Sequence, residues 1–141
     1  MSEVRLKSSL KPIFSQYPIV VSYLFGSQAT QRATPLSDYD FAVAFSSRVK
    51  LAQYPRYKLQ LTTKLLRINN APWVDLVVLN DVKTPLLLKF NIIKEGRVIY
   101  EKNKKERQQL ECDILLKWYD QEYFECLWHT LFTKNLAQGK I

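Results

Sequence analysis

The chain has 141 residues, a length that fits one domain with a sizeable core and leaves little room for a second. Hydrophobic residues make up 47% of the sequence, and 3 Gly and 6 Pro are too few for a low-complexity or fibrous chain. No apolar run approaches the roughly 18 to 20 residues that span a bilayer, and the N-terminus lacks the apolar stretch of a secretory signal. These features exclude a membrane-spanning protein and predict a cytoplasmic single domain over residues 1–141.

The formal net charge is +8, and it is unevenly distributed. Residues 1–80 carry ten Lys or Arg but only four acids: Glu3, Asp38, Asp40 and Asp75. Such a surplus fits a polyanionic partner, and it equally fits a solvated basic surface. Because no recognition-helix or RNA-binding signature accompanies the charge, we predict no specific DNA or RNA binding.

The first half of the chain shows helical spacing followed by two strand-like runs. The apolar residues Leu6, Leu10, Ile13, Phe14 and Tyr17 predict an amphipathic helix, with Pro12 in its first turn. Residues 19–25 read as a buried strand that ends at Gly26-Ser27, where a short helix would begin. Residues 38–45 alternate as a second strand, with large apolar residues on one face and Asp38, Asp40 and alanines on the other. We expect the first face to be core and the second to be open.

The second half alternates between helix and strand signals. The pattern predicts a helix over 55–67, a strand over 74–80 with Asp75 near its start, and a helix capped at Thr84-Pro85 that stops at Gly96. A short strand over 97–100 precedes a long helix over 103–132, which starts at an Asn103 and Glu106 capping box. Strands interleaved with helices indicate an α/β fold.

Three acidic residues near strand starts predict a metal-dependent phosphoryl-transfer site. Asp38 and Asp40 stand two residues apart on one strand face, so their Cα atoms lie about 6.5 Å apart. Such a pair can hold two cations about 3.5 to 4 Å apart, and oxygen ligands favour Mg²⁺. Asp75, within an apolar run, would supply a third carboxylate, and a buried unpaired carboxylate would be costly without a metal. The small Gly26-Ser27 turn lets backbone amides approach the phosphates of a nucleotide.

These residues resemble a known family. LFGSQATQRATPLSDYDFAVAF, followed by PWVDLVVLN, is similar to the GSx10DxD and third-Asp signature of the nucleotidyltransferase superfamily that includes DNA polymerase β. Over roughly residues 10–125 the chain resembles the minimal nucleotidyltransferase (MNT) antitoxins of HEPN–MNT toxin–antitoxin pairs. The resemblance implies the polymerase β-like fold, which is a small mixed sheet flanked by helices with a long C-terminal helix.

The resemblance also implies an activity, which is Mg²⁺-dependent transfer of AMP from ATP to a tyrosine of a HEPN ribonuclease toxin. This modification would silence the toxin, with which the chain would form a hetero-oligomer. Gly26 and Ser27 would hold the ATP phosphates, Asp38 and Asp40 would bind the metals, and Asp75 would join the catalytic metal and help to deprotonate the attacking hydroxyl.

The turn after Gly26 departs from the family pattern. Family members often read GSxARG, whereas this chain has Thr30 and Gln31 in place of the Arg and Gly. The phosphate contacts on that turn would then be weaker, or Arg32 would supply them. The intact set of three carboxylates still indicates an active enzyme.

Two alternative functions remain open at this stage. One is a nucleotidyltransferase for small molecules such as aminoglycosides, although those enzymes usually carry a further domain for the acceptor. The other is an antitoxin that blocks its partner by binding alone. The aromatic residues of the last helix, from Trp118 to Phe132, would form either core or a protein interface. A neighbouring reading frame for a HEPN protein would favour an antitoxin, and ATP-dependent labelling of that protein would establish catalysis.

Overall fold

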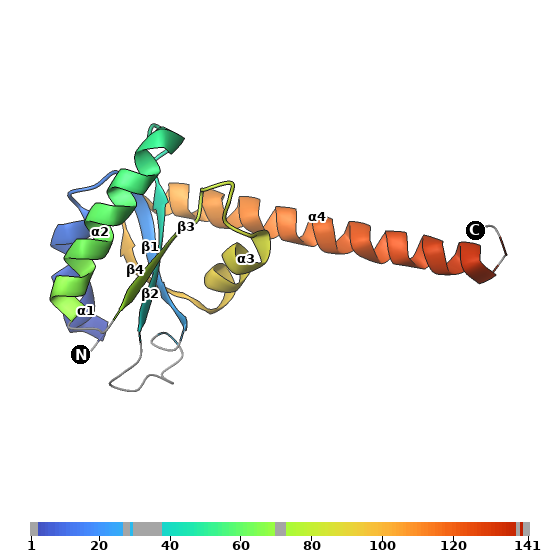
Figure 1. Cartoon of the computed structure of the whole chain (residues 1–141), viewed down its shortest axis with the longest axis horizontal. Coiled ribbons are helices and arrows are strands. Elements are labelled where there is room, and N and C mark those ends of the chain that lie inside the picture. The colour runs from blue at the N-terminus through green and yellow to red at the C-terminus, as the bar shows by residue number, and fades with distance from the viewer. Residues whose placement is uncertain (1–2, 27–28, 30–37, 70–72, 138, 140–141) are drawn as a thin grey trace.

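The computed structural model describes residues 3–26, 29, 38–69, 73–137 and 139, and its centre is a four-stranded mixed sheet (Figure 1). The strand order is β3-β2-β1-β4. The strands are β1 (Ile19–Phe25), β2 (Tyr39–Phe45), β3 (Val74–Val78) and β4 (Arg97–Glu101). β1 runs antiparallel to both β2 and β4, whereas β2 and β3 are parallel. The expected α/β fold with a small mixed sheet is therefore confirmed.

Helices cover both faces of this sheet (Figure 1). One face packs against α1 (Glu3–Phe14) and α2 (Tyr54–Asn69), the latter preceded by the short 3-10 helix η2 (Leu51–Gln53). The other face packs against α3 (Leu86–Glu95) and the first turns of α4 (Lys104–Ala137). The helix expected over residues 103–132 is thus observed over a longer range, and its body begins one residue later.

The larger core lies between the sheet and the α1–α2 layer. Phe14 of α1 meets Phe41 of β2 edge to face with ring centroids 6.4 Å apart, and Leu61 and Leu65 of α2 are fully buried beside them. Pro12 lies in the last turn of α1, not in its first turn as the sequence suggested. Burial of Leu6 and Leu10 extends the helix upstream and outweighs the hydrogen bond that a proline cannot donate.

The second face of β2 differs from the expectation that it would be open. Ala42 and Ala44 are buried, and they belong to a second apolar cluster with Leu79 and with Ile92 of α3. Small side chains let helices approach the sheet closely, so the alanines mark a packing surface. Asp40, near the start of the strand, is only half-buried. The opening is therefore confined to that end of the sheet.

The first turns of α4 are fastened to the sheet by polar contacts. Asn103 Oδ1 accepts hydrogen bonds from the backbone N–H groups of Lys105 and Glu106 at 3.0 and 3.2 Å, so the predicted cap at Asn103 is confirmed. The buried hydroxyl of Tyr23 donates to Glu111 Oε1 at 2.5 Å. Burial and the adjacent Glu111 raise the pKa of Tyr23, so the phenol keeps its proton and remains a donor. Arg107 contacts Glu111 as well, at 3.2 Å.

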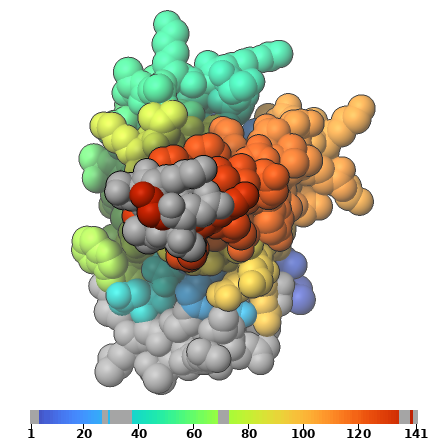
Figure 2. Space-filling model, turned by 90° about the vertical axis from the view of Figure 1, so that its right-hand side faces the viewer, coloured from blue at the N-terminus to red at the C-terminus, as the bar shows by residue number. Residues whose placement is uncertain are grey.

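The C-terminal half of α4 extends away from the domain (Figure 1). Nearer its start, α4 packs on α3, where Phe90 stacks on Trp118 with ring centroids 4.7 Å apart and meets Tyr119 edge to face at 6.1 Å. A helix of 34 residues is about 51 Å long at 1.5 Å per residue. Figure 2 shows the molecule from the side toward which α4 points, with the orange and red helix standing in front of the body. No helix among the described residues is long and apolar enough to cross a membrane.

Candidate active site

Three of the residues singled out in the sequence meet at one end of the sheet. β1 ends at Phe25, whose partner on β2 is Asp40, and Gly26 follows directly. Asp40 is in turn the partner of Asp75 on the parallel strand β3. Neighbouring residues in register project to the same face of a sheet, so the two carboxylates form a row across β2 and β3. The structure therefore places Gly26, Asp40 and Asp75 together.

Gly26 is adjacent to the Asp40 side chain. Its φ angle is +73°, a left-handed conformation that favours glycine. A Cβ atom added at this position would overlap Oδ2 of Asp40 and lie 3.1 Å from its Cγ. The sequence therefore requires glycine at residue 26 for two reasons, which are the backbone angle and the space taken by the carboxylate.

The charges of two neighbouring carboxylates act on Asp40. Asp38 is exposed and directly precedes β2, and Asp75 is exposed on β3. Partial burial raises the pKa of Asp40, and the negative charges of Asp75 and Asp38 raise it further. Like charges held this close disfavour ionisation of the middle carboxyl unless a cation neutralises them. This end of the sheet therefore gathers negative charge that a cation would neutralise.

Mg²⁺ fits the donor chemistry of this site. Its preferred ligands are oxygens, and it usually takes one or two carboxylates together with substrate phosphates and water. Within the described part of the chain, no three His, Cys, Asp or Glu side chains form a preformed metal site. The carboxylates of Asp38 and Asp40 would hold the ion only with the nucleotide phosphates completing its shell. Such an ion would screen the charges that raise the pKa of Asp40.

Two predicted phosphate-binding residues, Ser27 and Arg32, lie outside the described residues. The short helix expected after Gly26 falls largely in the same segment. Ala29, which the structure describes, donates its N–H to the Gly26 carbonyl at 3.2 Å. The contacts of Ser27 and Arg32 with a nucleotide therefore stay predictions.

A groove beside Asp75 was missed by the sequence analysis. It has a volume of about 470 Å³ and runs along β3 past Leu76 and Val78. Its other walls come from the start of α2, with Tyr54 and Lys58, and from the segment that leads into α3, with Lys83. No sequence motif could reveal it, because the lining residues come from segments that are far apart in the chain.

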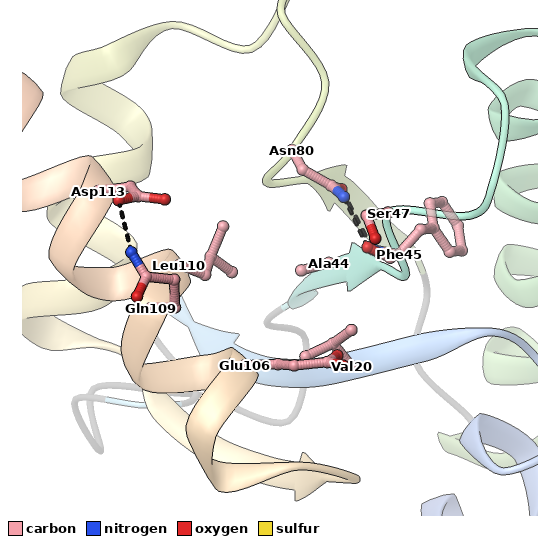
Figure 3. A pocket seen from close by; sticks show the side chains of 9 residues that line it. All are labelled: Val20, Ala44, Phe45, Ser47, Asn80, Glu106, Gln109, Leu110 and Asp113. Carbon is pink, nitrogen blue, oxygen red and sulfur yellow. Dashed lines mark hydrogen bonds between the residues drawn. The ribbon is translucent and has the colours of Figure 1, made fainter.

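A smaller cavity lies at the opposite end of β2, between the sheet and α4 (Figure 3). Its volume is about 280 Å³, and its lining includes Phe45, Asn80, Leu110 and Asp113. The Asn80 side chain accepts from the Phe45 N–H at 3.1 Å and donates to the Phe45 carbonyl at 2.7 Å, which extends the sheet pairing beyond β3. None of the predicted site residues lines this cavity, so the candidate site is the Asp40–Asp75 end.

Comparison with known proteins identifies the family. The family model described as "Polymerase beta, Nucleotidyltransferase" matches residues 8–105, which include all the residues of the candidate site. The chain therefore belongs to the polymerase β nucleotidyltransferase family. None of the curated protein sequences matches it.

The fold is similar to that of several solved toxin–antitoxin structures. One, a toxin–antitoxin structure with AMP-PNP, aligns with TM-score 0.66 and 16% identity over 96% of this chain and 99% of that chain. Another contains a tri-AMPylated Shewanella oneidensis HEPN toxin in complex with an MNT antitoxin, with TM-score 0.64, 14% identity and the same two coverages. The toxin–antitoxin MntA–HepT structure aligns with TM-score 0.58 and 16% identity over 95% of this chain and 96% of that chain. At these identities the likeness establishes the fold.

The fit between Gly26 and Asp40 can be tested by a double-mutant cycle. We expect Gly26→Ala to lower the free energy of unfolding by about 2 kcal/mol, because left-handed backbone costs alanine about 1–2 kcal/mol and the Cβ also displaces the Asp40 carboxylate. Adding Asp40→Ala should recover part of this loss by removing Oδ2. Urea denaturation measures the free energy of unfolding of the wild-type chain, of each single variant and of the double variant. Gly139→Ala is the matched control, since Gly139 has φ +66° and no atom within 4 Å of an added Cβ. Strict additivity of the two substitutions would show that the two residues do not interact.

Proposed function

We propose that the chain is a protein adenylyltransferase that acts as an antitoxin in the cytoplasm. It would transfer AMP from ATP, with Mg²⁺, to a tyrosine hydroxyl of a HEPN ribonuclease toxin, and residues 1–141 would form one minimal nucleotidyltransferase domain. The observation that carries this proposal is the carboxylate row Asp40–Asp75, with Asp38 beside it, against the Gly26 turn of a polymerase β family chain.

The proposed reaction is an in-line displacement at the α-phosphorus of ATP. The tyrosine oxygen forms a bond to the α-phosphorus as the bond between that phosphorus and the bridging oxygen to the β-phosphate breaks, and pyrophosphate leaves. Asp75 would receive the hydroxyl proton, because a phenol with pKa about 10 attacks poorly at neutral pH without a base. Asp38 and Asp40 would hold the metal-bound triphosphate in place. Two Mg²⁺ ions would supply Lewis-acid neutralisation of the charge that develops on the phosphates.

Exposed apolar residues on α4 support a protein as the acceptor. Tyr123 is 71% exposed and Phe124 is 65% exposed. At 100° per residue these two share one side of the helix with Leu127 and Leu131. Leu127 and Leu131 are 43% and 49% exposed, so the domain leaves this apolar side uncovered. We define Tyr123, Phe124, Leu127 and Leu131 as the distal α4 face and propose that the partner docks on it.

The similar solved structures add support for the partner class. They are toxin–antitoxin structures, one of them with a tri-AMPylated HEPN toxin. Their alignments span 95% or more of this chain. A HEPN toxin as substrate is therefore the proposal to test first, and a small-molecule acceptor or binding without catalysis are the outcomes that would replace it.

Mass spectrometry tests the proposal directly. The chain would be incubated with ATP, Mg²⁺ and the HEPN-type protein encoded by a neighbouring reading frame, if its genome provides one. We expect the partner to gain one or more AMP groups on tyrosine and to lose ribonuclease activity. Inhibition of the ribonuclease without any AMP on the partner would support binding-only antitoxin action. Transfer to an aminoglycoside, with no labelling of the partner, would support the small-molecule alternative.

The metal-binding role of the carboxylate pair predicts a large loss of activity. Replacing both Asp38 and Asp40 by Asn keeps the side-chain shape and removes two negative charges, so we expect the transfer rate to fall by about three orders of magnitude or more. The double variant should remain folded, and without metal it should melt at a slightly higher temperature because the charges near Asp75 no longer repel. Wild-type transfer rates in the double variant would rule out this site.

Asp75 is expected to act on the acceptor side. If Asp38 and Asp40 hold the nucleotide-bound metal, Asp75→Asn should leave Mg–ATP affinity within a few-fold of wild type and nearly abolish AMP transfer. Nucleotide binding, melting temperature and transfer would be measured on one preparation. A purely structural role for Asp75 predicts a lower melting temperature with transfer per folded molecule unchanged. Simultaneous loss of ATP binding and transfer would contradict the separate roles proposed for the three carboxylates.

Docking on the distal α4 face can be tested without disturbing the fold. The double variant Tyr123→Ala and Phe124→Ala should weaken partner binding by about tenfold or more, as expected for aromatic anchors at an interface. Its melting temperature should not change, because both side chains are mostly exposed. The matched control is Glu122→Ala with His129→Ala, on the opposite side of the helix, which we expect to bind normally. Calorimetric titration with the partner would measure the affinity of the double variant and of its control. Equal affinities would show that the distal α4 face does not bind the partner.

A further inference from the structure

β3 is an edge strand with hydrogen-bonding capacity on its outer side. In the described sheet it pairs only with β2, as a parallel neighbour. The backbone bonds Tyr39 N–H to Trp73 O (3.2 Å) and Leu79 N–H to Val43 O (2.8 Å) show which residues of this segment face β2. In a parallel ladder these residues alternate with residues that face away. The N–H and C=O groups of Leu76 therefore point outward.

This outer side of β3 lines the groove that begins at Asp75. Leu76, Val77 and Val78 form one wall, and Lys58 and Lys83 come from the two flanking segments. At about 3.3 Å per residue, the three wall residues span about 10 Å. The groove is therefore an open strand edge with a carboxylate of the candidate site at one end.

We infer that this groove receives the acceptor segment of the protein substrate as an added β-strand. The occupant is an extended stretch of the partner polypeptide that carries the acceptor hydroxyl and has an acidic residue opposite Lys58. The inference rests on the proposed function and specifies how that same site takes its substrate. Strand addition uses the backbone for affinity and alternate side chains for specificity.

The register of the sheet explains why an added strand would place the acceptor correctly. Asp40 and Asp75 are paired across β2 and β3. A residue that paired with Asp75 on an added strand would continue this row on the same face, with its Cβ about 4.5–5.5 Å from that of Asp75. A tyrosine at that place would hold its hydroxyl near the carboxylates. The side chain of the next residue on the added strand would project from the opposite face of the sheet, away from the carboxylates.

The chemistry of the groove favours a polypeptide over a small molecule. One wall is a strand edge at which the N–H and C=O groups of Leu76 point outward, whereas the Val78 carbonyl already accepts from the Thr84 hydroxyl at 2.7 Å and from the Asp81 N–H at 3.3 Å. Another extended backbone can pair with the Leu76 groups. The Asp75 end supplies the carboxylate for the hydroxyl, and the other charged residues of the lining are Lys58, Lys83 and Asp81. Exposed edges of this kind also attract unwanted strands, and lysine beside them discourages neutral ones. Asp81 offsets the charge of Lys83 on the wall that leads into α3, whereas the lining residues from α2 include Lys58 and no acid, so an acidic residue opposite Lys58 would be favoured.

Amide hydrogen exchange is the first test. The probes are the whole partner protein and a non-hydrolysable ATP analogue, added to the intact chain with Mg²⁺. We expect exchange of the outward Leu76 N–H to slow by about tenfold or more, because an added strand would accept its hydrogen bond. Amides of β4, the other edge strand, should exchange at unchanged rates. Unchanged exchange at Leu76 in a complex that still forms would overturn strand addition.

A charge-reversal pair is the second test. Lys58→Glu should lower kcat/KM for the partner by about tenfold, chiefly through KM, and leave Mg–ATP affinity unchanged. Arg56→Glu is the matched control, since it makes the same charge change two residues away on the other side of α2 and does not line the groove. Equal kcat/KM values for the two variants, with wild-type transfer intact, would overturn the groove assignment alone. Failure of the wild-type chain to label the partner would instead overturn the proposed function, and this inference with it.

Discussion

The register of β2 is the constraint on which the rest of the site depends. Side chains alternate along a strand with a period of two, so a slip of one residue would move Asp40 into the core under α1 and α2 and bring Phe41 to the opposite face. Two partners hold the register from opposite sides. β1 pairs with β2 in antiparallel fashion and ends beside Asp40, and β3 pairs in parallel and contributes Asp75. The burial of Phe41, Val43 and Phe45 on one face keeps the acidic residue on the other.

Much of this arrangement follows from local sequence patterns. The run Ile19–Phe25 coincides with β1, and the alternation after Asp38 gives β2, because strong β-branched and aromatic patterns have few competing structures. Asn103 caps α4 as expected, since a cap depends on neighbouring residues only. Asp75 was expected beside the Asp38–Asp40 pair because it is the only other acid in a strand-like run of this half, although nothing local specifies which strands become neighbours.

Other features depended on long-range packing and could not be predicted. Thr84 was expected to cap α3, but its hydroxyl donates to the Val78 carbonyl at 2.7 Å and so fastens the segment after β3. Ala42 and Ala44 were taken for an open face because their size is equally suited to a ligand and to a closely packed helix. The groove along β3 depends on three segments at once. In each case the missing information was the position of a distant element.

Long-range contacts at its N-terminal part also explain why α4 stays a regular helix where it extends beyond the rest of the domain. Its first turns are fixed by the Tyr23–Glu111 bond and by Arg107, which contacts Glu101 at 2.8 Å. Trp118 and Phe90 add an aromatic stack further along. Helix formation is cooperative, so a nucleated helix can propagate through residues that make no tertiary contacts of their own.

The projecting helix affects how copies of the chain interact with one another in solution. Apolar side chains on the distal α4 face attract other copies, whereas the net charge of +8 repels them at longer range. Salt shortens the range of the electrostatic repulsion, because the Debye length falls to about 10 Å at 0.1 M ionic strength. It does not weaken contacts between apolar surfaces. We therefore expect the isolated chain to be most soluble at low protein concentration and low ionic strength. A bound partner that covered the helix would remove this dependence on salt.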